Sequence, residues 1–565
     1  MQLKPLFTGI LLCLLAISAQ AQYNPLHIPD TISGTTFNLN MRDTFVQFRT
    51  GNQTITAGIN GTFWGPTLIF NQGDSVHMNV HNYLNDTTTL HWHGMHLPAV
   101  MDGGPHQTIP TGTVWQPYWK VTNNAATFWY HPHLHMKTEM QLLQGLGGFI
   151  IVRDPVEAAL ALPRTYGVDD IPLALTSRSF DVNNAFTNTS PYGDYMLVNG
   201  TMSPQVSLPK QFVRLRLLNV ELERGYNFGF SDNRTFWVIG NDGGLLDAPV
   251  PLTRTKLLPG ERVEILVNLG ADAVGSSIDL KAFNSGQPFG FPGSEPGTSG
   301  PFGSLLNNVD FNILHINVAA ATTGAITTLP TTLVSNTYWT AADATVTRTM
   351  NVTQGTPGPG GLPFSLDNTP FVLGTINKTV NLNAIEKWTL TNNNVFGHSF
   401  HIHDIEFKII SRSTGPVNSY ESGWKDTYYI GVNETVSFVA KFTDYADALH
   451  PFMYHCHIAP HEDGGMMGQF VVVDKTSVAQ TEIEPGDYTI YPNPANTRLY
   501  VTLSDPAMQV YYITITNSIG RTMYMLPRPQ LAGGIDISRF APGNYFMQLT
   551  DEATKKVLTK KFVKE

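Results

Sequence analysis

Histidines are concentrated in four short segments of this chain. Ten of its 18 histidines lie there, at His91 and His93, His131 and His133, His398, His401 and His403, and His455, His457 and His461. At this frequency chance would give about half of one His-x-His pair, whereas the chain has five when His133-x-His135 is counted. Imidazole is a ligand for copper, zinc, iron and nickel. The spacing therefore predicts metal centres rather than scattered core histidines.

A cysteine, Cys456, lies between two of these histidines. On an extended strand, residues i and i+2 point to one side and residue i+1 points to the other. The thiol is therefore expected to face away from its two flanking histidines. By the same alternation, His398 is expected to face away from His401 and His403. This pattern predicts two metal centres, one on each side of a pair of strands.

The first predicted centre combines Cys456, His398 and His461, with Met466 as a weak fourth ligand. One thiolate, two imidazoles and a long thioether contact are the ligands of blue-copper electron-transfer sites. Met467 is the alternative axial ligand. A buried, inert thiol beside ordinary histidines is the simpler alternative for the whole group.

The second predicted centre collects the other histidines of the four segments, namely His91, His93, His131, His133, His401, His403, His455 and His457. Eight imidazoles exceed the ligand number of one tetrahedral zinc ion, and imidazole suits copper well. A di-iron site would instead require carboxylates and Glu-x-x-His motifs on helices. The pattern therefore predicts several copper ions that share these side chains.

Short alternating segments that would position these ligands dominate the sequence, as at residues 36–41 and 75–80. Gly, Asn, Asp and Pro separate them, which is typical of an all-β protein built from sandwiches. Helical periodicity is confined to short pieces such as residues 139–143. Segments 285–304 and 355–363 are rich in Gly and Pro, and we expect surface loops or linkers there.

The N-terminal segment indicates export. Lys4 precedes an apolar run at residues 6–17, and a small-residue cleavage site ends at Ala21, as in secretory signals; an uncleaved anchor is the alternative. Loss of residues 1–21 would remove Cys13 and leave Cys456 as the only cysteine. We expect no membrane span in the mature chain, because no later segment has the required length. Acidic residues outnumber basic ones by 44 to 34, which disfavours nucleic-acid binding.

With these four segments the chain resembles the multicopper oxidases, a family that includes laccases, bilirubin oxidases and bacterial copper-efflux oxidases. The resemblance runs from about residue 36 to residue 473, with shorter matches at residues 65–68, 197–200, 214–219, 241–244 and 423–427. It implies three cupredoxin-like Greek-key β-sandwich domains, which we place at residues 22–155, 156–330 and 331–475. It also implies an oxidase that takes electrons singly from a reducing substrate and passes four of them to dioxygen, forming water.

The resemblance further implies four copper ions and a role for each ligand. Type 2 copper would be bound by His91 and His401. The two type 3 copper ions would be bound by His93, His131 and His457 and by His133, His403 and His455. Type 1 copper would be bound by Cys456, His398, His461 and Met466. Two carboxyl groups, those of Asp102 and Glu462, would act in catalysis by supplying protons; a purely structural hydrogen-bonding role is the alternative for both.

Two residues depart from the family pattern, namely Ser399 where proline is usual and Asp404 where glycine is usual. Neither removes a ligand, so we expect effects on local loop shape and substrate approach. Residues 351–367 lack the methionine cluster of copper-efflux oxidases, which favours a phenolic, laccase-like substrate over Cu(I), Fe(II) or Mn(II). A soft-metal relay is one interpretation of a further group, but core packing is favoured; its members are Met95, His96, Met101, His106, His135, Met136 and Met140.

The C-terminal residues 483–565 contain no histidine and resemble the type A sorting domain of the type IX secretion system. The matching features are residues 491–494, residues 541–543 and a Lys-rich terminus. The resemblance implies a small β-sandwich that engages the secretion machinery and leaves the protein secreted or at the outer cell surface; the periplasm is the alternative location. An adhesive or carbohydrate-binding sandwich is the alternative for this segment.

Overall fold

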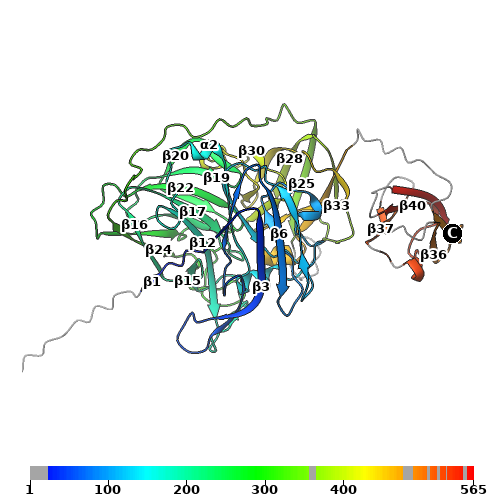
Figure 1. Ribbon diagram of the computed structural model, residues 1–565, viewed down its shortest axis with the longest axis horizontal. Coiled ribbons are helices and arrows are strands. Elements are labelled where there is room, and N and C mark those ends of the chain that lie inside the picture. The colour runs from blue at the N-terminus through cyan, green and yellow to red at the C-terminus, as the bar shows by residue number, and fades with distance from the viewer. Residues whose placement is uncertain are drawn as a thin grey trace, which may run out of the picture.

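Pairs of β-sheets, each pair closed around its own hydrophobic core, make up the computed structural model of the protein (Figure 1). It describes residues 23–354, 364–474, 488–504, 510–517, 522–527, 529, 531–551 and 557–565. The predicted signal segment 1–21 and the predicted loop 355–363 lie outside the described residues. The all-β prediction is confirmed, and the helix expected at residues 139–143 is α1 (Thr138–Gln144).

The first sandwich contains the first two histidine segments. In its strand β3 (Thr36–Val46) the first residues alternate, so that Phe37, Leu39 and Met41 are buried while their neighbours are half-buried or exposed. One sheet has the order β2 (Thr31–Ser33), β5 (Thr67–Asn71), β11 (Gly148–Arg153), β10 (Ala126–His131) and β7 (His91–His93). The other has the order β4 (Thr54–Ile59), β3 (Thr36–Val46), β6 (Ser75–Tyr83) and β8 (Val114–Trp115), with β9 (Tyr118–Lys120) also paired to β6.

The middle sandwich is the largest and carries none of the predicted ligands. Its first sheet has the order β1 (Asn24–Pro25), β16 (Pro204–Pro209), β24 (Asp310–Ala319), β23 (Ser277–Phe283), β18 (Tyr226–Phe230) and β21 (Thr255–Leu257). Its second sheet has the order β15 (Thr201–Met202), β14 (Tyr195–Val198), β12 (Asp170–Phe180), β17 (Phe212–Asn219), β22 (Arg262–Asn268), β19 (Phe236–Asn241) and β20 (Gly244–Leu252), with β13 (Phe186–Thr187) paired to β12. The pairing of β1 with β16 attaches the start of the described chain to this sandwich.

The third sandwich contains the last two histidine segments. One sheet has the order β26 (Phe364–Leu366), β25 (Val346–Gln354), β28 (Ile385–Asn392), β32 (Thr435–Lys441) and β30 (Phe407–Arg412). The other has the order β27 (Lys378–Asn381), β34 (Met467–Val473), β33 (Asp447–Cys456), β29 (His398–Ile402) and β31 (Thr427–Ile430). Adjacent strands β29 and β33 therefore hold two ligand segments side by side, with His401 opposite His455.

Two short helices join the first and third sandwiches. The first backbone N–H groups of a helix need acceptors, and in α1 those of Thr138 and Glu139 donate to the Asp463 carboxylate at 3.1 and 2.9 Å. Asp463 ends α3 (Ala459–Asp463), which follows the last histidine segment. A residue of the third sandwich therefore caps a helix of the first, and loss of such a cap costs about 0.5–2 kcal/mol.

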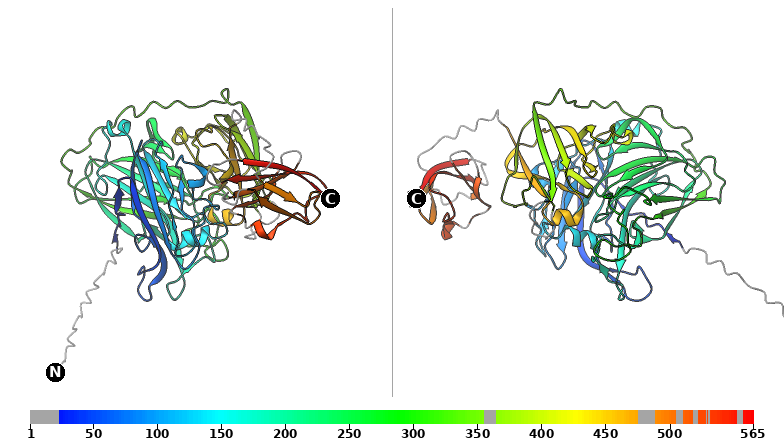
Figure 2. Two further views of the ribbon diagram at one scale, coloured as in Figure 1. Left: turned by 45° about the vertical axis from the view of Figure 1, so that its right-hand side comes forward. Right: turned by 180° about the vertical axis from the view of Figure 1, so that it is seen from behind.

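The remaining elements are short or C-terminal. They comprise α2 (Pro155–Ala158) and three 3-10 turns, η1 (Ala99–Met101), η2 (Ser419–Glu421) and η3 (Leu531–Gly533). One sheet of the C-terminal sandwich has the order β35 (Tyr488–Tyr491), β36 (Arg498–Leu503) and β39 (Ile535–Asp536). The other has the order β38 (Thr522–Pro527), β37 (Val510–Asn517), β40 (Gly543–Asp551) and β41 (Val557–Lys564). This sandwich lies to one side of the other three in each view (Figure 2).

Candidate metal centres

Strand β33 presents Cys456 and its flanking histidines to opposite sides. Cys456 packs in the core of the third sandwich with Phe400 and Ile458. His455 instead contacts the ring nitrogens of His133 and His403 outside that core. All of these side chains are almost completely buried. One strand thus reaches two separate groups of possible ligands, because alternate side chains of a strand point in opposite directions.

The three-ligand site consists of Cys456, His398 and His461. The Cys456 Sγ atom lies 3.6 Å from Nδ1 of each histidine, and the two Nδ1 atoms lie 3.2 Å apart. With metal bonds of about 2.0–2.1 Å to nitrogen and 2.3 Å to sulfur, ligand atoms on one ion lie roughly 3.3–3.4 Å apart for N and N and 3.5–3.7 Å for N and S. The observed separations match three atoms aimed at one ion.

Protonation at this site also favours metal binding. Burial lowers the pKa of His398 to about 3 and lowers that of His461 well below its usual value. Both imidazoles are therefore neutral at physiological pH and have a lone pair available. Burial raises the pKa of Cys456 to about 12, so the thiol keeps its proton unless a cation displaces it. Metal binding at this site should therefore release a proton.

The two candidate axial methionines lie in different surroundings. Met466 packs in the same core cluster as Cys456, and its carbonyl accepts the Cys456 backbone N–H at 3.0 Å. Met467 packs instead against Phe371 and Met453 and is paired in register with His455. This separation supports Met466 rather than Met467 as the residue next to the thiol.

The eight other predicted ligands form a second group, the histidine cluster, where the first and third sandwiches meet. In its first half, His455 Nε2 lies 3.2 Å from His133 Nε2 and 3.3 Å from His403 Nε2. In the other half, His93 Nδ1 lies 3.4 Å from His131 Nε2 and 3.2 Å from His457 Nε2. Each separation is close to that of two nitrogens on one metal ion. The two triplets are those expected for the type 3 ions.

His91 and His401 complete the cluster. Their Nε2 atoms are buried and have no hydrogen-bond partner among the described residues, a condition that needs an explanation in a folded protein. In both residues the other ring nitrogen, Nδ1, donates to a backbone carbonyl at 2.9 Å, of Asp102 and Asp426 respectively. The free lone pairs are therefore the Nε2 pairs, and these nitrogens lie with that of His403 in one possible metal-binding group.

Burial sets the charge of the cluster. It lowers the pKa of five members well below the usual histidine value, and the neighbouring imidazoles lower it further; these are His93, His131, His401, His403 and His457. Neutral imidazoles are the ligand form. The donor set of these buried rings fits copper, and the set of Cys456, His398 and His461 fits a blue-copper ion.

Both predicted acids contact the histidine cluster directly. The Glu462 carboxylate lies 3.1 Å from His133 Nδ1 and 3.2 Å from His455 Nδ1, and it accepts the Thr138 hydroxyl at 2.7 Å. The Asp102 carboxylate accepts His403 Nδ1–H at 2.7 Å. The carboxylates thus lie on the Nδ1 side of these three rings, which leaves the Nε2 side for a metal.

A third carboxylate at the cluster was missed by the sequence reasoning. Asp426 Oδ1 lies 3.2 Å from His93 Nε2, and both Asp426 oxygens accept the Arg262 guanidinium at 2.7 and 2.6 Å. Arg262 belongs to β22 of the middle sandwich, which is how that sandwich reaches the cluster. Arg262 and Asp426 are 164 positions apart, so no local pattern marks their contact. The only sequence signal for Asp426 was the family resemblance around residues 423–427.

The two departures from the family pattern have local structural consequences. Ser399 donates its hydroxyl to the Pro259 carbonyl at 2.7 Å. Asp404 takes a left-handed backbone conformation with φ of 72°, which is unfavourable for a residue other than glycine. Its carboxylate forms an ion pair with His96 Nδ1 at 2.8 Å. The substitution therefore adds a contact between the first and third sandwiches.

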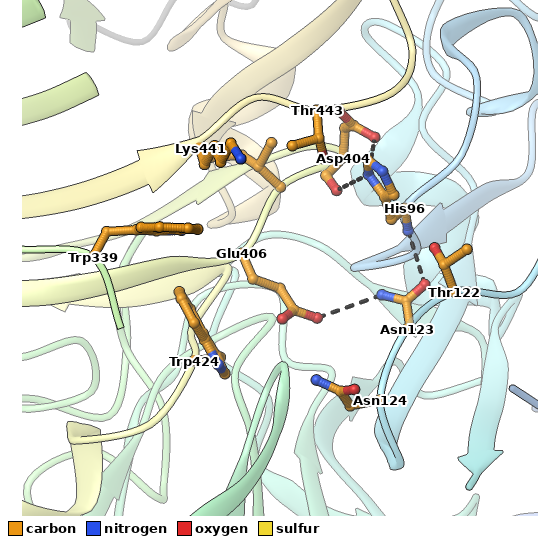
Figure 3. Close-up of a pocket in the computed structure, with 11 residues that line it drawn as sticks. His96, Thr122, Asn123, Asn124, Trp339, Asp404, Glu406, Trp424, Lys441 and Thr443 are labelled. Carbon is orange, nitrogen blue, oxygen red and sulfur yellow. Dashed lines mark hydrogen bonds and ion pairs between the residues drawn. The ribbon is translucent and has the colours of Figure 1, made fainter. Parts of the chain in front are cut away.

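A cavity of about 310 Å³ lies beside this ion pair (Figure 3). Figure 3 shows the Glu406 side chain between Trp424 and Asn123, whose amide donates to it at 3.4 Å. Burial raises the pKa of Glu406 to about 8. Asp404 lines this cavity and directly follows the candidate ligand His403 in the chain.

The further methionine and histidine group is dispersed. Met95 is completely buried in the first core, whereas Met136 and Met140 are 52% and 42% exposed. His106 contacts Gln469 at 2.8 Å, and His135 packs against Phe371. These different surroundings are those of ordinary packing and surface residues.

Comparison with known proteins identifies the family. Models described as multicopper oxidase match residues 40–157 and 340–476, and one described as secretion system C-terminal sorting domain matches residues 489–565. A laccase-like multi-copper oxidase of Ochrobactrum sp. has a solved structure with 32% identity and a TM-score of 0.71, over 80% of this chain and 100% of its own. The chain belongs to the multicopper oxidase family.

Other proteins similar to this chain differ in what they are named for. A laccase from Pediococcus acidilactici has 31% identity and a TM-score of 0.70, over 81% of this chain and 95% of its own. The cell division protein FtsP of Sodalis glossinidius is 30% identical, over 81% of this chain and 94% of its own length. The proteins similar to this chain thus include one named for a cellular role as well as oxidases.

The comparison also supports export. The C-terminal sorting domain is of the type IX secretion class, which makes a secreted or surface location the expected one and the secretion machinery a partner. Among the described residues, no helix combines the length and the hydrophobicity that crossing a bilayer would need.

Proposed function

We propose that this multicopper oxidase is a secreted, laccase-like enzyme that oxidises a phenolic substrate and reduces dioxygen to water. In balanced form, four phenols each lose one electron and one proton, and one dioxygen takes up four electrons and four protons to give two waters. Copper ions, when bound, would supply the one-electron redox chemistry. The supporting observation is that Cys456 belongs to the three-ligand site while both neighbours in the chain belong to the histidine cluster.

The residues that would hold four copper ions are those predicted from the sequence. The three-ligand site with Met466 would hold type 1 copper. His91 and His401 would hold type 2 copper, and the two triplets around His455 and His93 would hold the type 3 ions. Support comes from ligand-atom separations of 3.2–3.4 Å between ring nitrogens, as expected for shared ions.

The peptide chain itself provides the path between the two regions. An electron that leaves the Cys456 sulfur reaches His455 or His457 through covalent bonds alone. Strand β33 fixes this arrangement, because its pairing with β29 places Cys456 opposite Phe400 and His455 opposite His401. The three-ligand site would therefore accept electrons from substrate, and the histidine cluster would receive them.

Protons for oxygen reduction would come through the carboxyl groups at the cluster. Glu462 contacts two ring nitrogens and the Thr138 hydroxyl, and Asp102 contacts His403. Both acids lie at the edge of the cluster in which dioxygen would be reduced, and general acid catalysis would require them to reach the reacting oxygen directly or through one water. Their contacts with the rings also hold the rings in place, so the two functions coexist in one side chain.

Two alternatives need separate tests. A metallo-oxidase acting on Cu(I), Fe(II) or Mn(II) would use the same copper sites with another reductant. The likeness to FtsP raises a role without oxidase chemistry, but such a role would not need twelve converging ligands. Two similar proteins of solved structure support a phenol oxidase, since one is a laccase and the other has oxidase activity towards lignin model compounds.

The decisive experiment measures copper per chain together with oxygen uptake on phenols and on the three metal ions. We expect four copper ions, uptake of one dioxygen per four phenols and no accumulation of peroxide. Fewer than four copper ions at full occupancy, or peroxide as the only product, would overturn the oxidase proposal. Turnover on a metal ion but on no phenol would replace the laccase-like assignment with the metallo-oxidase one.

A further inference from the structure

A second cavity, of about 600 Å³, lies between the middle and third sandwiches. We call it the Lys256 cavity. On one side it is lined by Arg254, Lys256 and Phe289 of the middle sandwich, and on the other by residues that include Arg412, Tyr429 and Glu434 of the third. None of these residues belongs to the proposed copper sites.

Two cations of this cavity lack a counter-ion. Neither Lys256 nor Arg254 forms an ion pair with any described residue; instead, each lies over aromatic rings. The Arg254 guanidinium is 3.5 Å from the centre of the Phe283 ring, and the Lys256 ammonium is 5.6 Å from that of Tyr429. Burial lowers the pKa of both residues and outweighs the opposing effect of the carboxylates around them.

The acids of the cavity are already engaged. Arg412 forms ion pairs with Glu421 at 2.5 Å and with Glu434 at 3.0 Å. Glu434 also accepts the Thr414 hydroxyl at 2.6 Å, and Glu421 accepts the Asn418 amide at 2.7 Å. The three cations of the cavity outnumber its two carboxylates, so its net charge is positive. Lys256 and Arg254 are the cations that remain available to pair with a ligand. An incoming ligand would therefore gain most from a negative charge.

Aromatic rings form the apolar part of the same wall. Phe289 is 66% exposed, so its ring is accessible to an incoming ligand. The Tyr429 ring lies beside the Lys256 ammonium. The cavity thus offers positive charge next to flat apolar surface, which suits an anion attached to an aromatic ring.

The wall of the Lys256 cavity packs against Gly397, the residue that precedes His398 of the three-ligand site. A Cβ atom at Gly397 would lie 2.4 Å from Cε2 of the Tyr429 ring, so this ring packs directly on the Gly397 backbone. The Gly397 N–H donates to the Gly290 carbonyl at 2.7 Å, which fixes the loop that carries Phe289. His398 follows Gly397 in the chain. A ring bound against Tyr429 would therefore be close to a ligand of the proposed type 1 copper.

We propose that the Lys256 cavity binds the reducing substrate, and that this substrate is an aromatic anion: a phenol that carries a carboxylate or sulfonate group. The anionic group pairs with Lys256 and Arg254, and the ring lies on Tyr429 and Phe289. This inference rests on the proposed phenol oxidase function, because only an oxidised substrate needs to approach His398.

The first test uses benzoate, which binds without being oxidised, and isothermal titration calorimetry of the copper-loaded full chain. We expect Lys256→Met to raise the benzoate Kd at least about tenfold, on the scale of one charged hydrogen bond, and Lys256→Arg to retain binding. Arg254→Gln is the second variant, in case the first fails to fold. Lys281→Met is the matched control, because Lys281 lies over Phe283 in the same sandwich but does not line the cavity.

The second test compares two phenols of similar size. For 4-hydroxybenzoate, Lys256→Met should raise KM about tenfold with kcat unchanged, whereas KM for uncharged 4-hydroxybenzyl alcohol should stay the same. Benzoate should compete with 4-hydroxybenzoate. Absence of benzoate binding, binding that neither variant weakens, or inhibition that is not competitive would each overturn the inference. If benzoate binding depends on Lys256 but no phenol is oxidised, the proposed function fails while the anion site stands.

Discussion

The three-ligand site and the histidine cluster differ in what surrounds their imidazoles. In the cluster, carboxylates of Glu462 and Asp102 contact the second nitrogen of three rings. In the three-ligand site, His398 Nε2 is buried with no partner among the described residues, and the Phe364 ring packs against both histidines. The cluster is therefore equipped to exchange protons, whereas the three-ligand site is equipped only for electrons. Oxygen reduction needs both, and one-electron uptake from a substrate needs only the second.

Removing the thiol is the change that separates the two regions most completely. Cys456→Ser should abolish the visible thiolate-to-copper absorption and reduce oxygen uptake to background, because electrons can no longer enter. The histidine cluster should still bind copper, so the count should fall from four to three ions per chain. Absorption spectra, metal analysis and oxygen uptake check this. A variant with full colour would show that Cys456 is not the ligand.

Removing a carboxylate at the cluster should affect oxygen reduction alone. Glu462→Gln takes away the charge that contacts His133 and His455, and we expect a 10- to 100-fold loss of turnover, about the range for such supporting groups. The three-ligand site should keep its colour and still be reduced by substrate. Stopped-flow reduction and reoxidation measure the two halves separately.

The control for this variant is Glu386→Gln, which removes a buried carboxylate of the third sandwich that pairs with Arg348 at 2.6 Å. It should lower stability but leave the reoxidation rate unchanged. Equal loss of reoxidation in both variants would mean that Glu462 acts through folding and not at the cluster.

Stability should depend on pH through a contact outside both copper regions. Burial opposes the charge of His96, but Asp404 and Asp444 outweigh it and raise its pKa to about 10. A raised pKa stabilises the fold fully below the unfolded value of about 6.5, and this stabilisation is lost as the pH rises towards 10. His96→Gln should therefore cost about 2 kcal/mol at pH 6 and little at pH 10. Thermal unfolding at both pH values tests this; a constant difference would exclude the ion pair as its source.

The smallest expected effect distinguishes the two methionines. Met466→Leu should keep the colour of the three-ligand site and raise its reduction potential, because a weak electron donor is removed. The change conserves volume and should cost less than about 1.5 kcal/mol of stability. Met467→Leu is the matched control and should leave the potential unchanged. A shift in the second variant instead of the first, measured by redox titration, would make Met467 the axial residue.

The grouping of the candidate ligands on two sides of a strand pair could be predicted from sequence, because it depends on local rules. Alternation along β29 and β33 separates His398 and Cys456 from their neighbours without any knowledge of the rest of the fold. The strands at residues 36–41 and 75–80 followed from the same period of two. Family resemblance then supplied the two multicopper oxidase regions and the sorting domain, which the family models confirm; the division into domains at residues 155 and 330 stays a prediction.

What could not be predicted depends on contacts between distant residues. Arg262 and Asp426 meet only because β22 of the middle sandwich lies against the cluster. The Lys256 cavity requires two sandwiches to face each other, and the pairing of Asp404 with His96 spans 308 positions. Charged residues at such places look like ordinary surface residues in a sequence, since nothing local marks their partners.

Because Asp463 of the third sandwich caps α1 of the first, copper retention should depend on the presence of residues 462 and 463. Residues 138 and 139 are held by Asp463, and the neighbouring Glu462 steadies two rings of the cluster. A polypeptide truncated before residue 462 would have an unfinished helix and an open oxygen site, and it would lose its metal to any chelator. During export, only molecules in which the first and third sandwiches have met would therefore retain copper at the histidine cluster.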